Sequence, residues 1–327
     1  MRTADNPLKG KAIKRKSTYH RVIVPVHIPA LDGYYETSLK VFMTCFSSIL
    51  KTSHDETAIT VVDDASCKEV HNELYRLLKE GAIDELIVHD KPKGKIASVA
   101  KAFRASNESL VTICDADVLF LPGWQSSVEK IFVSFPKVGM VSPLPLPNLD
   151  TYCSAWSFYW GLTRFRLKSC KSFDPKMTAA FFRSLGGRFE SKRAPLGIVN
   201  RGSEVLALIG SGHFCATYRN EIRNFIPESL PDGPWTNEWE REFLDLPIQA
   251  GGYMRLATSE GYVYHMGNSF EPWMSEELRK IPHFVEKKLA KGLTTTEGFF
   301  HKLPLRSIIS RILLSSSFRK IILRLHR

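Results

Sequence analysis

The stretch LVTICDADVLFLPGW, residues 110–124, contains the features that decide the fold. It begins with an apolar β-type run, and Asp115 and Asp117 follow directly with one residue between them. Side chains two positions apart on an extended backbone project from the same side, so the two carboxylates converge. Mg²⁺ and Mn²⁺ prefer oxygen ligands and complete their coordination with substrate phosphates. The stretch therefore predicts an apolar strand that ends in a divalent-cation site.

A turn is the alternative interpretation of Asp115-Ala116-Asp117, because aspartate is common in turns that precede helices. The motif alone does not distinguish a turn from a metal site. The surrounding sequence is therefore needed to choose between them.

Upstream of this stretch, apolar strand-like runs alternate with helical patterns. The expected strands are 21–27, 58–62, 85–89 and 110–114, and the expected helices are 35–50, 68–79 and 96–106. This alternation predicts an α/β fold with a mainly parallel central sheet and helices on both faces. Ligands bind such sheets at the carboxyl ends of the strands, where Asp63-Asp64 and Asp115-Asp117 both lie.

Downstream, the alternation weakens from about residue 150, and the segment 164–193 is dense in Lys and Arg. We interpret it as a basic insertion or mobile loop. Strand-like sequence returns at 206–218 and 262–265, with a helix expected around 238–250. The expected organisation is a basic N-terminal segment (1–19), a catalytic domain (20–275) with a nucleotide-binding part (20–130) and an acceptor-binding part (131–275), and a C-terminal tail (276–327).

The net charge of +11 and the isoelectric point near 9.3 favour an anionic partner. The basic residues do not interleave with aromatic residues on one sheet, and no recognition module is visible, so we expect no nucleic-acid partner. No secretory signal and no apolar stretch long enough to span a membrane is found. The cysteine spacing is typical of reduced thiols. We therefore expect a cytoplasmic protein.

The C-terminal tail has an unusual composition. After Glu297 it contains seven Lys and Arg residues, interleaved with Leu, Ile and Phe, and no acidic residue. Two short amphipathic helices rimmed by positive charge are expected, a pattern typical of segments that lie on an anionic membrane surface. This predicts a peripheral protein on the inner face of the cell membrane. The alternative is that the tail packs back on the catalytic domain.

Six motifs in order resemble the family 2 glycosyltransferases with the GT-A fold. They are VIVPV (22–26), VVDDAS (61–66), Gly94-Lys95 ahead of a helix, CDADVLFLPGW (114–124), GSGHFCATYR (210–219) and YHMGN (264–268). The resemblance implies a hexosyltransferase that moves a sugar, with inversion, from a nucleotide-diphospho-sugar to a hydroxyl group. It also implies a UDP-sugar donor, a glycan or lipid-linked glycan acceptor, and Mn²⁺ or Mg²⁺.

The resemblance also assigns a donor site. It places Asp63 and Asp64 at the nucleoside, where a carboxylate accepts a hydrogen bond from the N3–H of uracil. The other residues that it implies for the donor are Pro25, Val26, Lys95, Asp115, Ala116 and Gly212. For the metal it implies Asp115 and Asp117, with His265 as a third ligand.

Inverting members need a carboxylate that removes the proton of the attacking hydroxyl. The family position falls on or near Glu240, but this sequence lacks the usual Glu-Asp pair, and Glu238 and Glu242 compete with it. A pKa raised by partial burial would suit such a base. The neighbouring Trp235 and Trp239 are expected to supply that burial or a stacking surface for an acceptor sugar.

Three alternatives remain open. A sugar-nucleotide nucleotidyltransferase shares the sheet and the acidic metal ligands, but it normally has a glycine-rich basic loop after its first strand, and HIPALDGYY (27–35) is not one. The second is a non-enzymatic basic protein that binds nucleic acid. The third is a relative of the family that binds its ligands without turnover.

Overall fold

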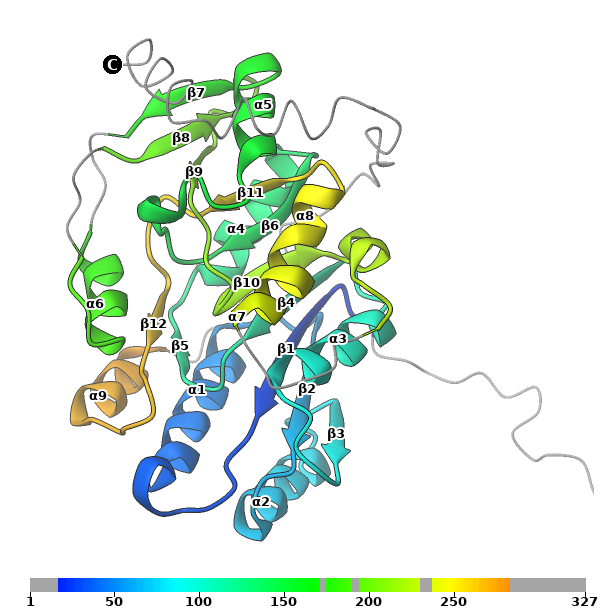
Figure 1. Ribbon diagram of the computed structural model, residues 1–327. Coiled ribbons are helices and arrows are strands. Elements are labelled where there is room, and N and C mark those ends of the chain that lie inside the picture. The colour runs from blue at the N-terminus through cyan, green and yellow to red at the C-terminus, as the bar shows by residue number, and fades with distance from the viewer. Residues whose placement is uncertain (1–16, 171–174, 190–193, 230–236, 283–327) are drawn as a thin grey trace, which may run out of the picture.

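The computed structural model describes residues 17–170, 175–189, 194–229 and 237–282. Most strands belong to a ten-stranded sheet with the order β3-β2-β1-β4-β10-β6-β11-β9-β8-β7 (Figure 1). Two short strands, β5 (Val118–Phe120) and β12 (Val263–His265), form a separate antiparallel pair.

The first half of the chain forms the parallel part of the sheet. Its strands are β1 (His20–Val26), β2 (Thr57–Asp64), β3 (Glu85–His89) and β4 (Leu110–Cys114). Its helices are α1 (Ser38–Thr52), α2 (Lys68–Lys79) and α3 (Lys95–Ala105), with a 3₁₀ turn at Gly33–Tyr35 before α1. Each of these strands and helices was predicted from the sequence, and α2, β3 and β4 have the predicted bounds.

The second half makes the sheet mixed. Strand β10 (Cys215–Arg219) lies antiparallel between β4 and β6 (Val138–Ser142), and β11 (Met254–Ala257) runs parallel to β6. The antiparallel strands β9 (Leu206–Ile209), β8 (Leu196–Val199) and β7 (Arg166–Ser169) complete the sheet. Because β10 reverses direction between them, β6 and β11 point the same way as β1 to β4.

The interpretation of 164–193 as a loop is wrong for two of its parts. Residues 166–169 form β7, and Lys176–Ser184 form α6, which lies against β12. Phe165 and Leu167 are buried, whereas Arg166 and Lys168 between and after them are exposed. This alternation is the signature of a half-buried strand, and the density of positive charge concealed it.

The helix expected around 238–250 is present in three joined pieces. They are α7 (Asn237–Glu240), a π-helical turn (Arg241–Asp245) and α8 (Leu246–Ala250). The remaining helices are α4 (Trp124–Ser134), α5 (Ala155–Thr163) and α9 (Pro272–Lys280), with 3₁₀ turns at Pro147–Leu149 and Asn220–Phe225. Single π turns inside helices occur frequently at functional sites.

Helices cover both faces of the sheet, as predicted. On β1, the alternating side chains of Val22, Val24 and Val26 pack with α1 and α2, whereas Ile23 packs with α3 and α8 on the other face. A third apolar cluster joins α4 and α5 to the antiparallel strands. The sheet is therefore fixed on both sides, and the ends of its strands form a rigid base for side chains.

Residues 1–16 and 283–327 lie outside the described residues, and with them lie most of the predicted N-terminal segment and C-terminal tail. The membrane role of the tail therefore stays a prediction. Among the described helices, none has the length and apolar character needed to cross a bilayer. All six cysteines are free thiols.

Candidate active site

The Asp-Ala-Asp segment is fixed by two other predicted motifs. The backbone N–H of Asp115 donates to the carbonyl oxygen of Phe214 at 2.8 Å, and the N–H of Met266 donates to the carbonyl of Asp117 at 2.7 Å. Phe214 belongs to GSGHFCATYR and Met266 to YHMGN. The backbone therefore brings together, beyond the carboxyl end of β4, three motifs that are far apart in the sequence.

Asp115, Asp117 and His265 form one group, which we call the carboxyl-end cluster. One ligand atom from each lies within 4.8 Å of the others, and Nε2 of His265 is 3.4 Å from Oδ2 of Asp117. Oδ1 of Asp117 is buried and has no hydrogen-bond partner within the described part of the chain. Burial raises the pKa of Asp117, against the opposing effect of His265. Two carboxylates, an imidazole and an unsatisfied buried oxygen fit a divalent cation.

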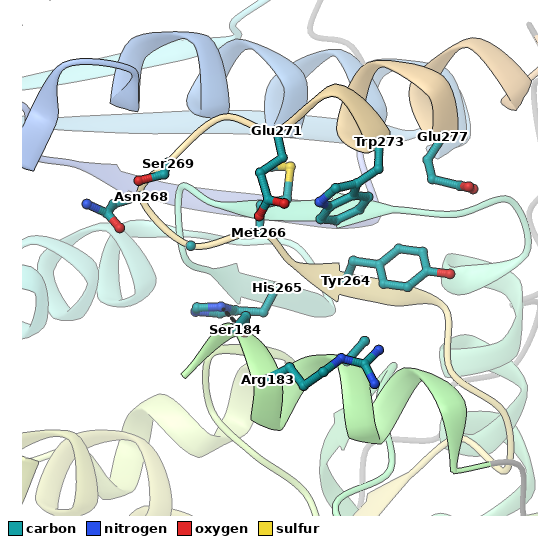
Figure 2. Close-up of a pocket in the computed structure, with 12 residues that line it drawn as sticks. Arg183, Ser184, Tyr264, His265, Met266, Asn268, Ser269, Glu271, Trp273 and Glu277 are labelled. Atoms are coloured by element: carbon teal, nitrogen blue, oxygen red, sulfur yellow. Dashed lines mark hydrogen bonds between the residues drawn. The ribbon is translucent and has the colours of Figure 1, made fainter. Parts of the chain in front are cut away.

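His265 is oriented by α6. Its Nδ1 and the hydroxyl of Ser184 are hydrogen-bonded at 2.9 Å, as Figure 2 shows, which directs Nε2 toward Asp117. The rings of Phe181 and Phe214 pack edge-on against the imidazole. Partners that hold the second nitrogen of a histidine are typical of metal ligands. No pattern in the sequence pointed to Ser184, because its helix lies in the segment interpreted as a loop.

Asp63 and Asp64 are both held by protein groups. Asp63 accepts the N–H of Ser66 at 2.9 Å and also contacts His71, so it closes the turn after β2. Asp64 accepts the N–H groups of Lys93 and Gly94, both at 2.8 Å, and a bond from His89 at the same distance.

Burial opposes the ionisation of Asp64, but these hydrogen bonds outweigh it and lower its pKa. The carboxylate of Asp64 thus fixes the loop in front of α3, and its contact with a nucleoside stays a prediction. The side chain of Val26 is fully buried, which leaves only its backbone for a contact with a base, whereas Pro25 is partly exposed.

Lys95 connects two carboxylates that the sequence placed in different roles. Its Nζ is 2.5 Å from Oδ1 of Asp115 and 2.8 Å from Oε1 of Glu240. Burial disfavours the ammonium, yet the two carboxylates dominate and raise the pKa of Lys95. The preceding Gly94 has φ +85°, a conformation that other residues rarely adopt, and this sharp turn aims the first residue of α3 at the site.

Of the three candidate glutamates, Glu240 is buried and faces Lys95, whereas Glu238 and Glu242 are exposed. Burial raises the pKa of Glu240, but the hydrogen bond from His213 and the charge of Lys95 outweigh it and lower the pKa to about 2. The expectation of a raised pKa is therefore wrong for this arrangement. Its cause lies in the two cationic neighbours, which come from distant parts of the chain.

His213 was not assigned a role from the sequence. Its Nε2 is 2.9 Å from Oε2 of Glu240, and its Nδ1 is 3.1 Å from Oδ2 of Asp245. Asp245 is fully buried and also accepts bonds from Arg255 at 2.7 Å and Tyr152 at 2.9 Å. Burial lowers the pKa of His213, but the two carboxylates raise it to about 9. His213 is therefore an imidazolium at neutral pH that bridges Glu240 and Asp245.

The other predicted residues have varied positions. Gly212 is buried, and a Cβ there would lie 2.6 Å from the side chain of Leu146, so close packing explains this glycine. Ala116 lines a cavity of about 140 Å³ that also contains Asp117. Trp239 is partly buried and packs on the apolar cluster under α3, and Trp235 lies outside the described residues. An acceptor role for either tryptophan stays a prediction.

Residues 28–184 match the protein family described as Glycosyl transferase family 2. No curated protein matches the chain.

Solved structures that match include the mannosyltransferase PcManGT from Pyrobaculum calidifontis in complex with GDP-Man and Mn²⁺, with 14% identity, a TM-score of 0.43, and coverage of 74% of this chain and 54% of that one. GalNAc-T7 with UDP, GalNAc and Mn²⁺ has 14% identity, a TM-score of 0.44, and coverage of 77% and 44%. S. aureus TarS 1-349 has 14% identity, a TM-score of 0.44, and coverage of 80% and 63%. The chain thus spans between 44% and 63% of the length of these proteins.

Proposed function

We propose that this chain, which belongs to glycosyl transferase family 2, transfers a hexose from a UDP-sugar to a hydroxyl of a glycan or lipid-linked glycan with inversion. Its α/β sheet with helices on both faces has the GT-A fold. One observation carries the proposal: Lys95 joins the carboxyl-end cluster, through Asp115, to a single buried glutamate, Glu240. A site for an anionic leaving group and a candidate base thus lie next to each other.

A divalent cation, Mn²⁺ or Mg²⁺, fits between Asp115, Asp117 and His265. The unsatisfied Oδ1 of Asp117 supports this assignment, because a buried carboxylate oxygen without a partner is costly. When bound, the cation would neutralise negative charge on the diphosphate. Ser184 would hold His265 in place from the other side.

Glu240 is proposed as the general base. It accepts the proton of the acceptor hydroxyl while the hydroxyl oxygen bonds to the anomeric carbon, and the bond from that carbon to the diphosphate breaks with its electron pair on the phosphate oxygen. His213 holds Oε2, so Oε1 is the oxygen that would receive the proton once Lys95 has left it. No covalent intermediate with the enzyme is needed.

The position of Lys95 can change the pKa of this base. With Lys95 and His213 both present, the pKa of Glu240 is about 2, and such a carboxylate is a weak base. Diphosphate oxygens are strong partners for an ammonium group. If Lys95 turns to the donor's diphosphate, Glu240 loses one cationic neighbour and its pKa rises. Binding of the donor would then raise the pKa of Glu240 and make it a stronger base.

The test is incubation of the purified full chain with a panel of nucleotide sugars and Mn²⁺, followed by measurement of the released nucleotide diphosphate. We expect release from at least one UDP-sugar, and loss of release when the metal is chelated. Production of pyrophosphate from a nucleoside triphosphate and a sugar phosphate would instead favour the nucleotidyltransferase. No reaction with any nucleotide sugar would contradict the proposal.

The tail (276–327) is proposed to hold the enzyme on an anionic membrane surface, near a lipid-linked acceptor. The sequence alone supports this, through its seven basic residues after Glu297. Liposome flotation with and without acidic lipid tests it, comparing the full chain with one that ends at Gly298. Equal recovery of both chains in the soluble fraction at low salt would contradict it.

A further inference from the structure

A second cavity lies beside the carboxyl-end cluster. Its volume is about 560 Å³, and its walls are α6, the residues from β12 to the start of α9, and α9 itself (Figure 2). This size is within the range of about 300–1,000 Å³ that is typical of small-molecule sites. The residues that give it chemical character are Arg183, Ser184, Tyr264, Asn268, Trp273 and Glu277.

The lining combines aromatic rings with charged groups of both signs. Tyr264 and Trp273 lie edge to face, with ring centroids 5.5 Å apart, and both are only partly buried. In Figure 2, Arg183 extends from α6 on one wall, and Glu271 and Glu277 lie on the other wall with Trp273. Glu277 is paired with Lys280 at 2.7 Å, and Glu271 caps α9.

This combination selects among ligand classes. An apolar ligand would cover the guanidinium of Arg183 without offering it a hydrogen-bond partner, which is unfavourable. A multiply phosphorylated ligand would meet the two carboxylates, and like charges repel. A neutral sugar has C–H faces that stack on aromatic rings, and its hydroxyl groups both donate to carboxylates and accept from a guanidinium. Saccharide chemistry therefore fits the whole lining.

The position of the cavity assigns this saccharide to the acceptor. His265 lines the cavity and also belongs to the carboxyl-end cluster, while Gly267 and Asn268 line both this cavity and the smaller one that contains Asp117. The predicted nucleoside residue Asp64 belongs to β2, in the other part of the fold. In a nucleotide-diphospho-sugar, the sugar is bonded to the phosphate farthest from the nucleoside. An acceptor therefore approaches from the side of the cluster opposite to the nucleoside.

We propose that this cavity, which we call the α6–α9 cavity, binds a neutral saccharide portion of the acceptor, with Trp273 as its stacking surface. The inference rests on the proposed function. Arg183 contributes hydrogen bonds to hydroxyl groups, and the segment that was interpreted from the sequence as a basic loop supplies one wall of the acceptor site. The tryptophans chosen from the sequence, Trp235 and Trp239, are not needed for it.

Saturation-transfer NMR of the full chain tests the proposal with four neutral disaccharides: maltose, cellobiose, lactose and N,N′-diacetylchitobiose. At least one should bind, and Trp273→Ala should weaken its binding by about tenfold, as expected for the loss of one stacking contact. Trp273→Phe keeps an aromatic ring and should retain most of the affinity. Tyr75→Ala, at an exposed tyrosine on α2, is the matched control and should change nothing.

Nucleotide release by hydrolysis of the donor, without acceptor, is measured in the same variants. Circular dichroism shows whether Trp273→Ala is folded, and the control Tyr75→Ala should hydrolyse the donor at the wild-type rate. The proposal is overturned if no disaccharide binds the wild-type chain, or if folded Trp273→Ala binds the disaccharide as tightly as wild type. If wild type binds a disaccharide but releases no nucleotide from any nucleotide sugar, the proposed function fails and the saccharide site stands.

Discussion

A second group of histidine and carboxylate side chains lies at the amino end of β1 and consists of His20, His54 and Glu129. It resembles in composition the carboxyl-end cluster beyond β4. In this amino-end cluster, Oε1 of Glu129 is 3.1 Å from Nδ1 of His20 and 2.9 Å from Nε2 of His54. The other two ring nitrogens bond to Thr112 and Thr57. Each imidazole nitrogen is therefore satisfied inside the fold.

The carboxyl-end cluster differs from the amino-end cluster in the exposure of its side chains more than in its composition. The side chains of His265 and Asp117 are 12% and 24% exposed, whereas those of His20 and Glu129 are both 0% exposed. Each cluster contains a carboxylate oxygen without a partner among the described residues, Oε2 of Glu129 and Oδ1 of Asp117. The side chains of Asp117 and His265 are partly exposed, so a ligand can approach the carboxyl-end cluster but not the amino-end cluster. We therefore propose that the same residue types stabilise the fold at one end of the strands and bind a cation at the other.

The largest effect should come from Asp117→Ala. It removes the unsatisfied carboxylate of the carboxyl-end cluster, so we expect nucleotide release to fall by about 10³-fold, while the midpoint of thermal unfolding stays close to that of wild type. His265→Ala should cause a milder loss, because water can replace one peripheral ligand. A variant Asp117→Ala that is unfolded, or fully active, would remove the contrast between the two clusters.

Glu129→Gln should show the opposite pattern. Removing one charge from a buried hydrogen-bonded group should lower the free energy of unfolding by about 3 kcal/mol, without a specific effect on catalysis in the folded fraction. Chemical denaturation monitored by circular dichroism measures this. Near-normal stability of Glu129→Gln would show that the amino-end cluster does not stabilise the fold.

Glu129 also makes a pH dependence testable. Burial opposes its ionisation, but the two histidines lower its pKa from 4.5 to about 2. Because the pKa is lower in the folded state, the stabilisation is fully present above pH 4.5 and is lost as the pH falls toward 2. The wild-type chain should lose stability more steeply than Glu129→Gln across this window.

Glu240→Gln is expected to reduce the transfer rate by at least about 10²-fold while donor binding is retained, because an amide cannot accept the proton. Glu242→Gln is the matched control on the same helical segment, and its exposed side chain should make it neutral. Rapid single-turnover measurements separate binding from transfer. If Glu242→Gln is impaired and Glu240→Gln is not, Glu240 is not the base.

The sequence separation of the interacting residues decides how much of each half of the fold could be predicted. The parallel strands and their helices follow from local periodicity, and the shared edge for Asp115, Asp117 and His265 follows from strand ends and the family resemblance. The bonds from Lys95 to Glu240 and from His213 to Glu240 join residues 145 and 27 positions apart. No local pattern encodes such pairs, so the low pKa of Glu240 was not predicted. In the segment 164–193, strand alternation was present but was outweighed by charge.

The smallest effect is expected from His213→Gln. Glutamine can donate a hydrogen bond to Glu240 but no longer bridges it to Asp245, so Glu240 is held less firmly and the rate should fall by about tenfold. Loss of the positive charge of His213 raises the pKa of Glu240, so the acidic limb of the kcat/KM profile should move to higher pH. Wild type should also change activity near pH 9, where His213 loses its proton, and the variant should not. An unchanged profile would restrict His213 to a structural role.

The proposed function requires that the carboxyl-end cluster bind the cation of a glycosyltransferase. Electron paramagnetic resonance of free Mn²⁺, titrated with the full chain in the presence of UDP, tests it without any need for turnover. We expect wild type and Glu129→Gln to bind one Mn²⁺ per chain and Asp117→Ala to bind none. Equal Mn²⁺ binding by wild type and Asp117→Ala would contradict it.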